Sequence, residues 1–96
     1  MSPRPKFRFQ LFVAGDAGNS AQAMVNLTAF CQKYLPERHA IEIVDVLRQP
    51  KRALAESIFL TPTLVAWTPP PVRRIVGTLS QTQTMLLTLG LEALAP

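Results

Sequence analysis

Hydrophobic and polar residues alternate from Phe7 to Val13, so one side of an extended chain is apolar and the other carries Arg8 and Gln10. This period of two predicts a β-strand. Farther along, apolar residues recur at helical spacing, as Ala23, Leu27, Phe30, Cys31, Tyr34 and Leu35. We expect a helix here that follows the turn at residues 14–19, has Ser20 as its N-cap, and ends before Pro36.

Residues 40–47 form an almost continuous apolar run rich in β-branched side chains, which is typical of a strand buried on both faces. Gln49-Pro50 opens a second helix with proline at its first position, and we expect it to reach about Leu60. Residues 63–67 and 72–76 read as a third and a fourth strand. The proline triplet 69–71 between them cannot donate ladder hydrogen bonds, so it must lie at an edge or a bulge.

Residues 79–94 fit two periods at once. As a helix, the segment begins with a capping box of Ser80 and Gln83 and has one apolar face. As a strand, it alternates from Thr84 onward, and its threonines and Gly90 favour the extended form. Two interpretations remain open: a buried helix that is apolar on most sides, or a segment that exchanges secondary structure.

The expected element order is βαβαββα, that of an α/β thioredoxin-like fold. Its first half is a parallel βαβ unit with a right-handed crossover. A length of 96 residues is that of one domain. We therefore predict a flexible tail over residues 1–6 and a single domain over residues 7–96.

Composition restricts the kind of protein. A hydrophobic share of 48% with 17% charged residues is too apolar for disorder and favours self-association or a partner face. The net charge of +4 permits an acidic partner, but the scattered basic residues do not indicate nucleic acid. Since no signal segment and no membrane-spanning apolar window are found, we expect a cytoplasmic protein that does not contact a membrane.

Candidate catalytic residues are few. Cys31, the single cysteine, falls on the apolar face of the first helix, which excludes disulfide chemistry and indicates a core residue. His39 is the single histidine and makes a poor metal site, so we expect it in a solvated loop. The sequence predicts no catalytic residue, no cofactor and no metal. Pro62, after Thr61, is a candidate cis-proline that would shape the turn before the third strand.

Two groups of cations are candidates for partner binding. Arg48, Lys51 and Arg52 gather at the start of the second helix, where the helix dipole disfavours positive charge. They are either a solvated basic end or a patch for an acidic partner. Arg73 and Arg74 follow the proline triplet in a predicted strand, whose alternation sends them to opposite faces.

Three stretches together resemble the KaiB family of circadian-clock proteins: residues 11–15 with Asn19-Ser20, residues 43–47, and Thr61-Pro62-Thr63-Leu64 running into the string at residues 69–77 and Leu79-Ser80. The resemblance covers residues 7–94, and the proline–arginine string is its most specific part. It implies a non-enzymatic regulator that binds the ATPase ring of a KaiC-family protein and modulates its phosphorylation cycle, with a KaiA-type protein as a further partner. It also implies a self-associated ground state, a dimer or tetramer with the fold βαββααβ, that converts to the thioredoxin-like form by rearranging its C-terminal half.

The chain departs from the family pattern at several positions. Gln22, Glu42, Ser57 and Ala66 stand where the family usually carries basic residues, some of them on the partner-facing surface, which favours a divergent ring as the partner. Thr88 and Gly90 replace a glycine and an aspartate beside the segment that switches fold. The other function considered is a thioredoxin-like sensor or interaction domain related to that of the clock-output histidine kinase.

Overall fold

The computed structural model describes residues 6–94. Within them the elements are β1 (Phe7–Val13), α1 (Gly18–Tyr34), β2 (His39–Asp45), α2 (Pro50–Ala55), β3 (Thr63–Thr68), β4 (Arg73–Val76), α3 (Thr82–Thr88) and the 3-10 turn η1 (Glu92–Leu94). The predicted order βαβαββα is confirmed. The predicted tail lies outside the described residues except for Lys6, whose carbonyl accepts a 2.8 Å hydrogen bond from Thr68 Oγ1.

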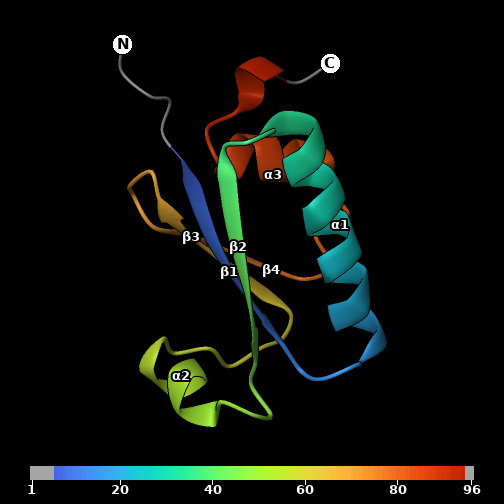
Figure 1. The fold of residues 1–96 in the computed structure, drawn as a ribbon, viewed down its shortest axis with the longest axis vertical. Helices are drawn as coiled ribbons and strands as arrows, with labels where there is room; N and C mark the ends of the chain where they lie inside the picture. Colours follow the sequence, from blue (N-terminus) through green and yellow to red (C-terminus); the bar gives the residue numbers. More distant parts are fainter. Residues whose placement is uncertain (1–5, 95–96) are drawn as a thin grey trace.

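The four strands form one sheet in the order β2-β1-β3-β4. β1 pairs with β2 in parallel, as the predicted crossover requires, whereas the β1–β3 and β3–β4 pairs are antiparallel. Helix α1 runs along one side of the sheet with α3 at its end, and α2 lies at the opposite end of the view (Figure 1). β2 and β4 are therefore the two edges of the sheet.

Alternation along β1 divides the core between the two faces of the sheet. One cluster faces α1 and α3 and includes Phe7, Phe9, Leu11 and Val13 from β1. A smaller cluster on the α2 side consists of Phe12, Val44, Ala53, Ile58 and Val65. The predicted apolar side of β1 is thus confirmed, and Phe12 is the one apolar residue that it sends to the other cluster.

The prediction that residues 40–47 form a strand buried on both faces is wrong. β2 ends at Asp45 and is an edge strand, and Val44 is its one fully buried residue. Ile43 is 42% exposed. A continuous apolar run indicates a strand, but it does not determine whether neighbours cover both of its faces.

The ends of α1 match the prediction at one terminus only. The helix ends at Tyr34, before Pro36, as expected. It begins at Gly18, however, and Ser20 is not its N-cap. Ser20 is buried, and its Oγ accepts a 3.0 Å hydrogen bond from Ala14 N–H, so it fastens the end of β1 instead of capping the helix.

The second and third helices are shorter than predicted. α2 stops at Ala55 because Ser57 adopts a left-handed conformation with φ of 56°, and residues 58–60 leave the helix. α3 is a helix, but no side chain caps its N-terminus at Gln81, so the predicted Ser80–Gln83 capping box is wrong. Its buried side comprises Met85 and Leu86, with Leu89 just after it, while Leu87 is exposed.

Candidate functional site

The place where a thioredoxin-type enzyme carries its thiols is occupied by a structural turn. Gly15 N–H donates to Asp45 Oδ1 at 3.1 Å, and Leu47 N–H donates to the same oxygen at 2.9 Å. Cys31 lies away from this turn in the core of α1, fully buried, and burial raises the pKa of its thiol to about 12. Its predicted place in the core is confirmed, and such a thiol is not a nucleophile at neutral pH.

Metal binding and insertion into a membrane have little support among residues 6–94. No group of three His, Cys, Asp or Glu side chains there is placed to hold a metal ion. His39 begins β2, where its Nδ1 lies 2.7 Å from Leu35 O, so it is part of the helix–strand junction and not the solvated loop residue that we expected. No helix in this part of the chain has the length and hydropathy needed to cross a bilayer.

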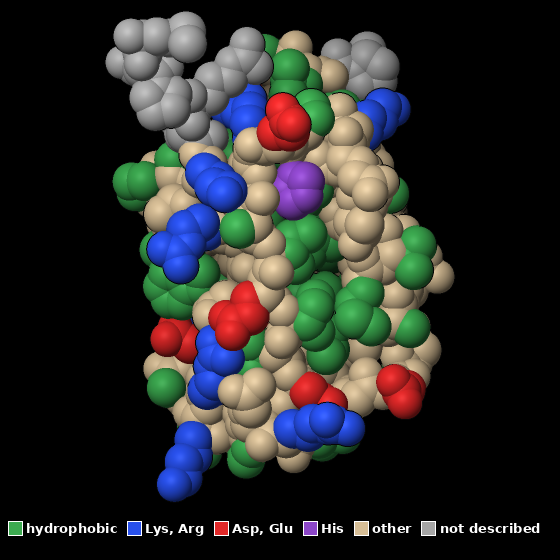
Figure 2. Space-filling model, viewed as in Figure 1, with side chains coloured by type: hydrophobic (Ala, Val, Ile, Leu, Met, Phe, Trp, Pro, Cys, Tyr) green, Lys and Arg blue, Asp and Glu red, His purple; other side chains and the backbone are tan. Residues whose placement is uncertain are grey.

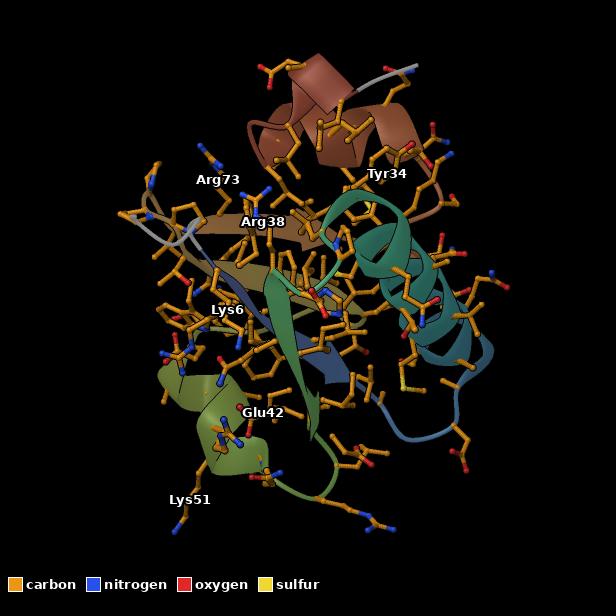
Figure 3. All side chains as sticks on the ribbon, turned by 45° about the horizontal axis from the view of Figure 1, so that its top comes forward. Lys6, Tyr34, Arg38, Glu42, Lys51 and Arg73 are labelled. Atoms are coloured by element: carbon orange, nitrogen blue, oxygen red, sulfur yellow. The ribbon has the colours of Figure 1, made fainter. Side chains whose placement is uncertain are left out.

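Arg48, Lys51 and Arg52 lie together at the start of α2, but they differ in what they contact. The side chain of Arg48 is 87% exposed, with its Nε 3.9 Å from Asp45 Oδ2. Lys51 is exposed and points away from the molecule (Figure 3). Arg52 instead turns inward to β2, where both of its terminal nitrogens donate 2.8 Å hydrogen bonds to Glu42. Arg48 and Lys51 are therefore available to a partner, whereas Arg52 is engaged.

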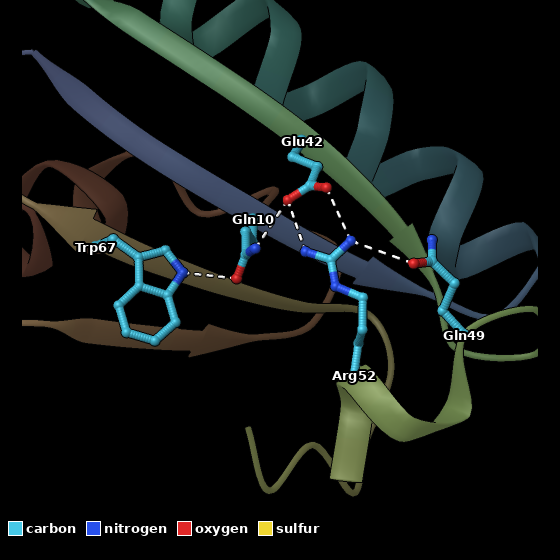
Figure 4. Close-up of polar contacts among 5 residues, drawn as sticks. All are labelled: Gln10, Glu42, Gln49, Arg52 and Trp67. Carbon is cyan, nitrogen blue, oxygen red and sulfur yellow. Dashed lines mark hydrogen bonds and ion pairs between the residues drawn. The ribbon is translucent and has the colours of Figure 1, made fainter. Parts of the chain in front are cut away.

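Glu42 is the centre of a polar network that crosses the sheet (Figure 4). Gln10 Nε2 on β1 donates to Glu42 Oε1 at 2.8 Å, and Trp67 Nε1 on β3 donates to Gln10 Oε1 at 2.7 Å. The hydrogen bonds from Arg52, and then the one from Gln10, lower the pKa of Glu42 to about 2. The network connects α2 to three strands of the sheet.

Arg73 and Arg74 project to opposite faces of β4, as predicted. Arg74 Nη2 lies 3.9 Å from Glu56 Oε2, just after α2. The guanidinium of Arg73 lies on the α3 side, with Nη1 and Nη2 3.6 and 3.7 Å from the point where a Cβ of Gly90 would be. The five predicted cations therefore do not form a single patch, and Figure 3 shows Arg73 and Lys51 far apart.

Several apolar side chains are exposed in the α2 region and beside it. Leu47, Leu54, Phe59, Leu60 and Val76 are all exposed, with Phe59 at 83%. This apolar surface was not predicted, because residues 58–60 were expected to lie inside the second helix. The sequence signal for this surface was the apolar triplet Ile58-Phe59-Leu60 before Thr61-Pro62. Of these three side chains, only Ile58 is buried. On the face shown in Figure 2, most Lys and Arg side chains follow the left side and the lower end, interleaved with acidic ones.

The remaining predicted positions have structural roles. The Thr61-Pro62 bond is cis, as proposed, and the carbonyl of buried Pro62 accepts the Gly77 N–H at 2.9 Å. Thr88 is the last residue of α3, and Gly90, with φ of 72°, follows its C-cap. Leu91 N–H bonds to Leu86 O, and Gly90 N–H bonds to Leu87 O, which is the Schellman pattern of a helix end.

The four departures from the family pattern lie in different environments. Gln22 and Ser57 are exposed, and Glu42 is the carboxylate at the centre of the polar network. Ala66 is only 4% exposed, in the cluster that faces α1 and α3. It therefore does not belong to an exposed partner-facing surface in this structure.

The fold agrees with that of solved thioredoxins. Chloroplastic thioredoxin z superposes with a TM-score of 0.74 over 94% of this chain and 81% of that one, at 23% identity. The N-terminal domain of Synechococcus elongatus SasA superposes with a TM-score of 0.66 over 96% and 88% of the two chains, at 22% identity. At these identities the likeness establishes the fold alone. With one buried cysteine, the chain is a thioredoxin-fold protein that lacks the thiol pair of the redox enzymes.

Sequence comparison identifies the family. Residues 10–91 match the model of the KaiB domain. The chain is 43% identical over 82 residues to the circadian clock protein KaiB3 of Synechocystis sp., covering 85% of this chain and 80% of that protein. It is 41% identical over 91 residues to the circadian clock oscillator protein KaiB of Prochlorococcus marinus strain SARG, covering 95% and 78%. The chain belongs to the KaiB family, as its sequence pattern indicated.

Proposed function

We propose that this chain is a non-enzymatic cytoplasmic regulator that binds the ATPase ring of a KaiC-family protein and modulates its phosphorylation cycle. Membership of the KaiB family carries the proposal. The thiol chemistry of Cys31 agrees with it, since a fully buried thiol with a pKa raised to about 12 cannot serve a redox reaction at neutral pH.

The contact surface of this proposal, the α2 surface, consists of Leu47, Arg48, Lys51 and Leu54. All four side chains are exposed, and Lys51 and Leu54 lie one turn apart on the same side of α2. An exposed cation beside exposed leucines suits a partner with acidic groups around an apolar centre. Arg52 contributes indirectly, because its bonds to Glu42 hold α2 against β2. Arg73 and Arg74 remain proposed partner contacts outside this surface, and a KaiA-type protein remains a second proposed partner.

The test is native mass spectrometry of the chain with KaiC-family hexamers from its own organism, with ADP or ATP present. We expect a complex, and we expect Lys51→Glu and Leu54→Ala each to raise the Kd about tenfold or more. Lys33→Glu is the matched control, because it makes the same charge change on α1, across the sheet from α2. The absence of a complex with every ring would contradict the proposal, as would equal effects of the two charge reversals.

We also propose that the chain has a second, self-associated state with the fold βαββααβ, with Thr88 and Gly90 beside the switching segment. Support comes from the two periods of residues 79–94 and from family membership. NMR secondary shifts of residues 80–94, recorded on each gel-filtration fraction, test this. Extended shifts in a dimer or tetramer fraction are expected, whereas helical shifts in every fraction would contradict it.

A thioredoxin-like sensor or interaction domain related to that of the clock-output histidine kinase is the second candidate function. The fold likeness to the N-terminal domain of SasA agrees with it. The KaiB-domain match over residues 10–91 favours the first candidate. A gene in which this chain is fused to a histidine kinase would reverse that preference.

A further inference from the structure

The outer edge of β4 carries main-chain groups that no other part of residues 6–94 pairs with. Gly77 N–H donates to Pro62 O at 2.9 Å, and this bond determines which residue pairs of the β3–β4 ladder are hydrogen-bonded. Hydrogen-bonded and non-bonded pairs alternate in an antiparallel ladder, so Ile75 and Leu64 form the next bonded pair. The N–H and C=O groups of Arg74 and Val76 consequently point away from β3, toward the free edge.

A small hollow lies beside this edge on each face of the sheet. On the α2 side, Val76 lines a hollow of about 160 Å³ together with Phe59 and Leu60. On the other side, Ile75 borders one of about 260 Å³ whose floor includes Leu79 and Met85. Successive side chains of an extended strand point to opposite faces, so a strand added at this edge would send its side chains alternately to the two hollows.

Charge limits what can occupy the edge. Arg74 projects beside Val76 on the α2 face, and its nearest acidic partner, Glu56, is at 3.9 Å. Arg73 adds a second cation to the same short strand, and the whole chain carries a net charge of +4. Pairing two copies of β4 would bring these arginines together, and charged residues on an edge strand disfavour such self-pairing. An acidic residue opposite Arg74 would be attracted.

We propose that the β4 edge binds an extended segment of another protein by antiparallel strand addition, and that this segment has the pattern apolar–apolar–acidic. The first apolar residue lies opposite Val76 and packs against Phe59. The second lies opposite Ile75 and enters the hollow beside Met85, and the acidic residue lies opposite Arg74. The site is distinct from the α2 surface, and the proposal is independent of ring binding.

The probe is an acetylated and amidated nonapeptide with the sequence Thr-Lys-Thr-Val-Val-Asp-Thr-Lys-Thr, titrated into the full chain. We expect a Kd below about 1 mM. Hydrogen exchange by NMR should slow at the amides of Arg74 and Val76, by about tenfold or more at saturation, since these gain partners. The amide of Ile75 already bonds to β3 and should change little. No binding at peptide concentrations of up to about 1 mM, or protection confined to the amide of Ile75, would overturn the proposal.

N-methylation of the peptide tests the strand register. The amide of the first valine faces β4, so its methylation should abolish binding. The amide of the second valine faces away, so the same methyl group there should be tolerated. Equal losses from the two peptides would overturn strand addition.

Charge exchange tests the acidic position. Arg74→Glu should weaken the aspartate peptide about tenfold and should favour the peptide in which lysine replaces aspartate. Arg48→Glu, the same reversal away from the edge, should leave the ratio of the two affinities unchanged. Sedimentation of the chain without peptide tests whether a second copy of the chain occupies the β4 edge instead. A dimer that Val76→Pro dissociates, together with no peptide binding, would show that it does and would overturn the proposal.

Discussion

Glu42 on β2 accepts two hydrogen bonds of 2.8 Å from Arg52 on α2, one donated by each terminal nitrogen of the guanidinium. α2 has only six residues, too few to be stable alone, so its position depends on tertiary contacts. Ala53 and Ile58 supply the apolar contacts beneath it, and the Glu42–Arg52 pair fastens its outer side. The proposed α2 surface is therefore held in place by Glu42, a residue of β2 that lies outside that surface.

A double-mutant cycle with Glu42→Gln and Arg52→Gln measures this connection. Because both side chains are partly exposed, at 51% and 39%, we expect only a weak coupling in the free energy of unfolding, measured in urea. Arg48→Gln is the control, because its 3.9 Å approach to Asp45 in a highly exposed setting should contribute almost nothing. A coupling of zero would mean that the pair does not fasten α2.

The same pair predicts how stability depends on pH. The hydrogen bonds from Arg52, and then the one from Gln10, hold the folded-state pKa of Glu42 at about 2, below its ordinary value of 4.5. A lowered carboxyl pKa stabilises the fold fully above the unfolded-state pKa, and this contribution is lost as the pH falls through the folded-state value. The stability difference between the parent chain and Glu42→Gln should therefore be constant above about pH 5 and shrink between pH 4.5 and 2.

Urea unfolding at a series of pH values measures that difference. Its size should stay within about 1 kcal/mol, since solvent screens an exposed pair. A difference that grew on acidification would contradict the assignment, because the charged form of Glu42 would then be the destabilising one.

Local periodicity predicted the strands and helices, but it did not correctly predict how deeply each of them is buried. The alternating residues of β1 match the two faces of the sheet, so the apolar side of this strand was identified correctly. Residues 40–47 carry the same β-branched composition whether a strand is central or at an edge. In the sheet, β2 has β1 as its one neighbouring strand. That strand order cannot be read from a local sequence pattern.

The missed part of the candidate site has the same origin. The second helix was expected to reach about Leu60, which would have placed Phe59 and Leu60 within it. The left-handed conformation of Ser57 ends α2 and leaves both side chains exposed. Conversely, Arg52 was predicted as a partner contact because a short sequence window does not reveal that Glu42 lies within 2.8 Å of it. These features depend on which distant residues meet, so a one-dimensional pattern is insufficient.

Cys31 should react slowly in the native protein. The side chain is fully buried and its thiol pKa is raised to about 12 by desolvation, so very little thiolate is present or accessible at pH 7. Labelling by a disulfide reagent should wait for transient opening of the structure, and it should accelerate by several orders of magnitude in denaturing urea. Complete labelling within seconds under native conditions would contradict this burial.

Gly90→Ala should destabilise the thioredoxin-like form by about 1 kcal/mol, because Gly90 occupies the left-handed region at φ of 72°. The cost comes from the backbone, since the new Cβ would lie 3.6 Å from Arg73 Nη1, an ordinary contact. Gly90→Asn should cost less, because asparagine tolerates this conformation. Gly18→Ala is the control: Gly18 begins α1 at an ordinary φ with open space around it, so alanine there should be neutral or slightly stabilising. Equal urea midpoints for the alanine and asparagine variants at position 90 would mean that the left-handed helix end does not contribute to stability.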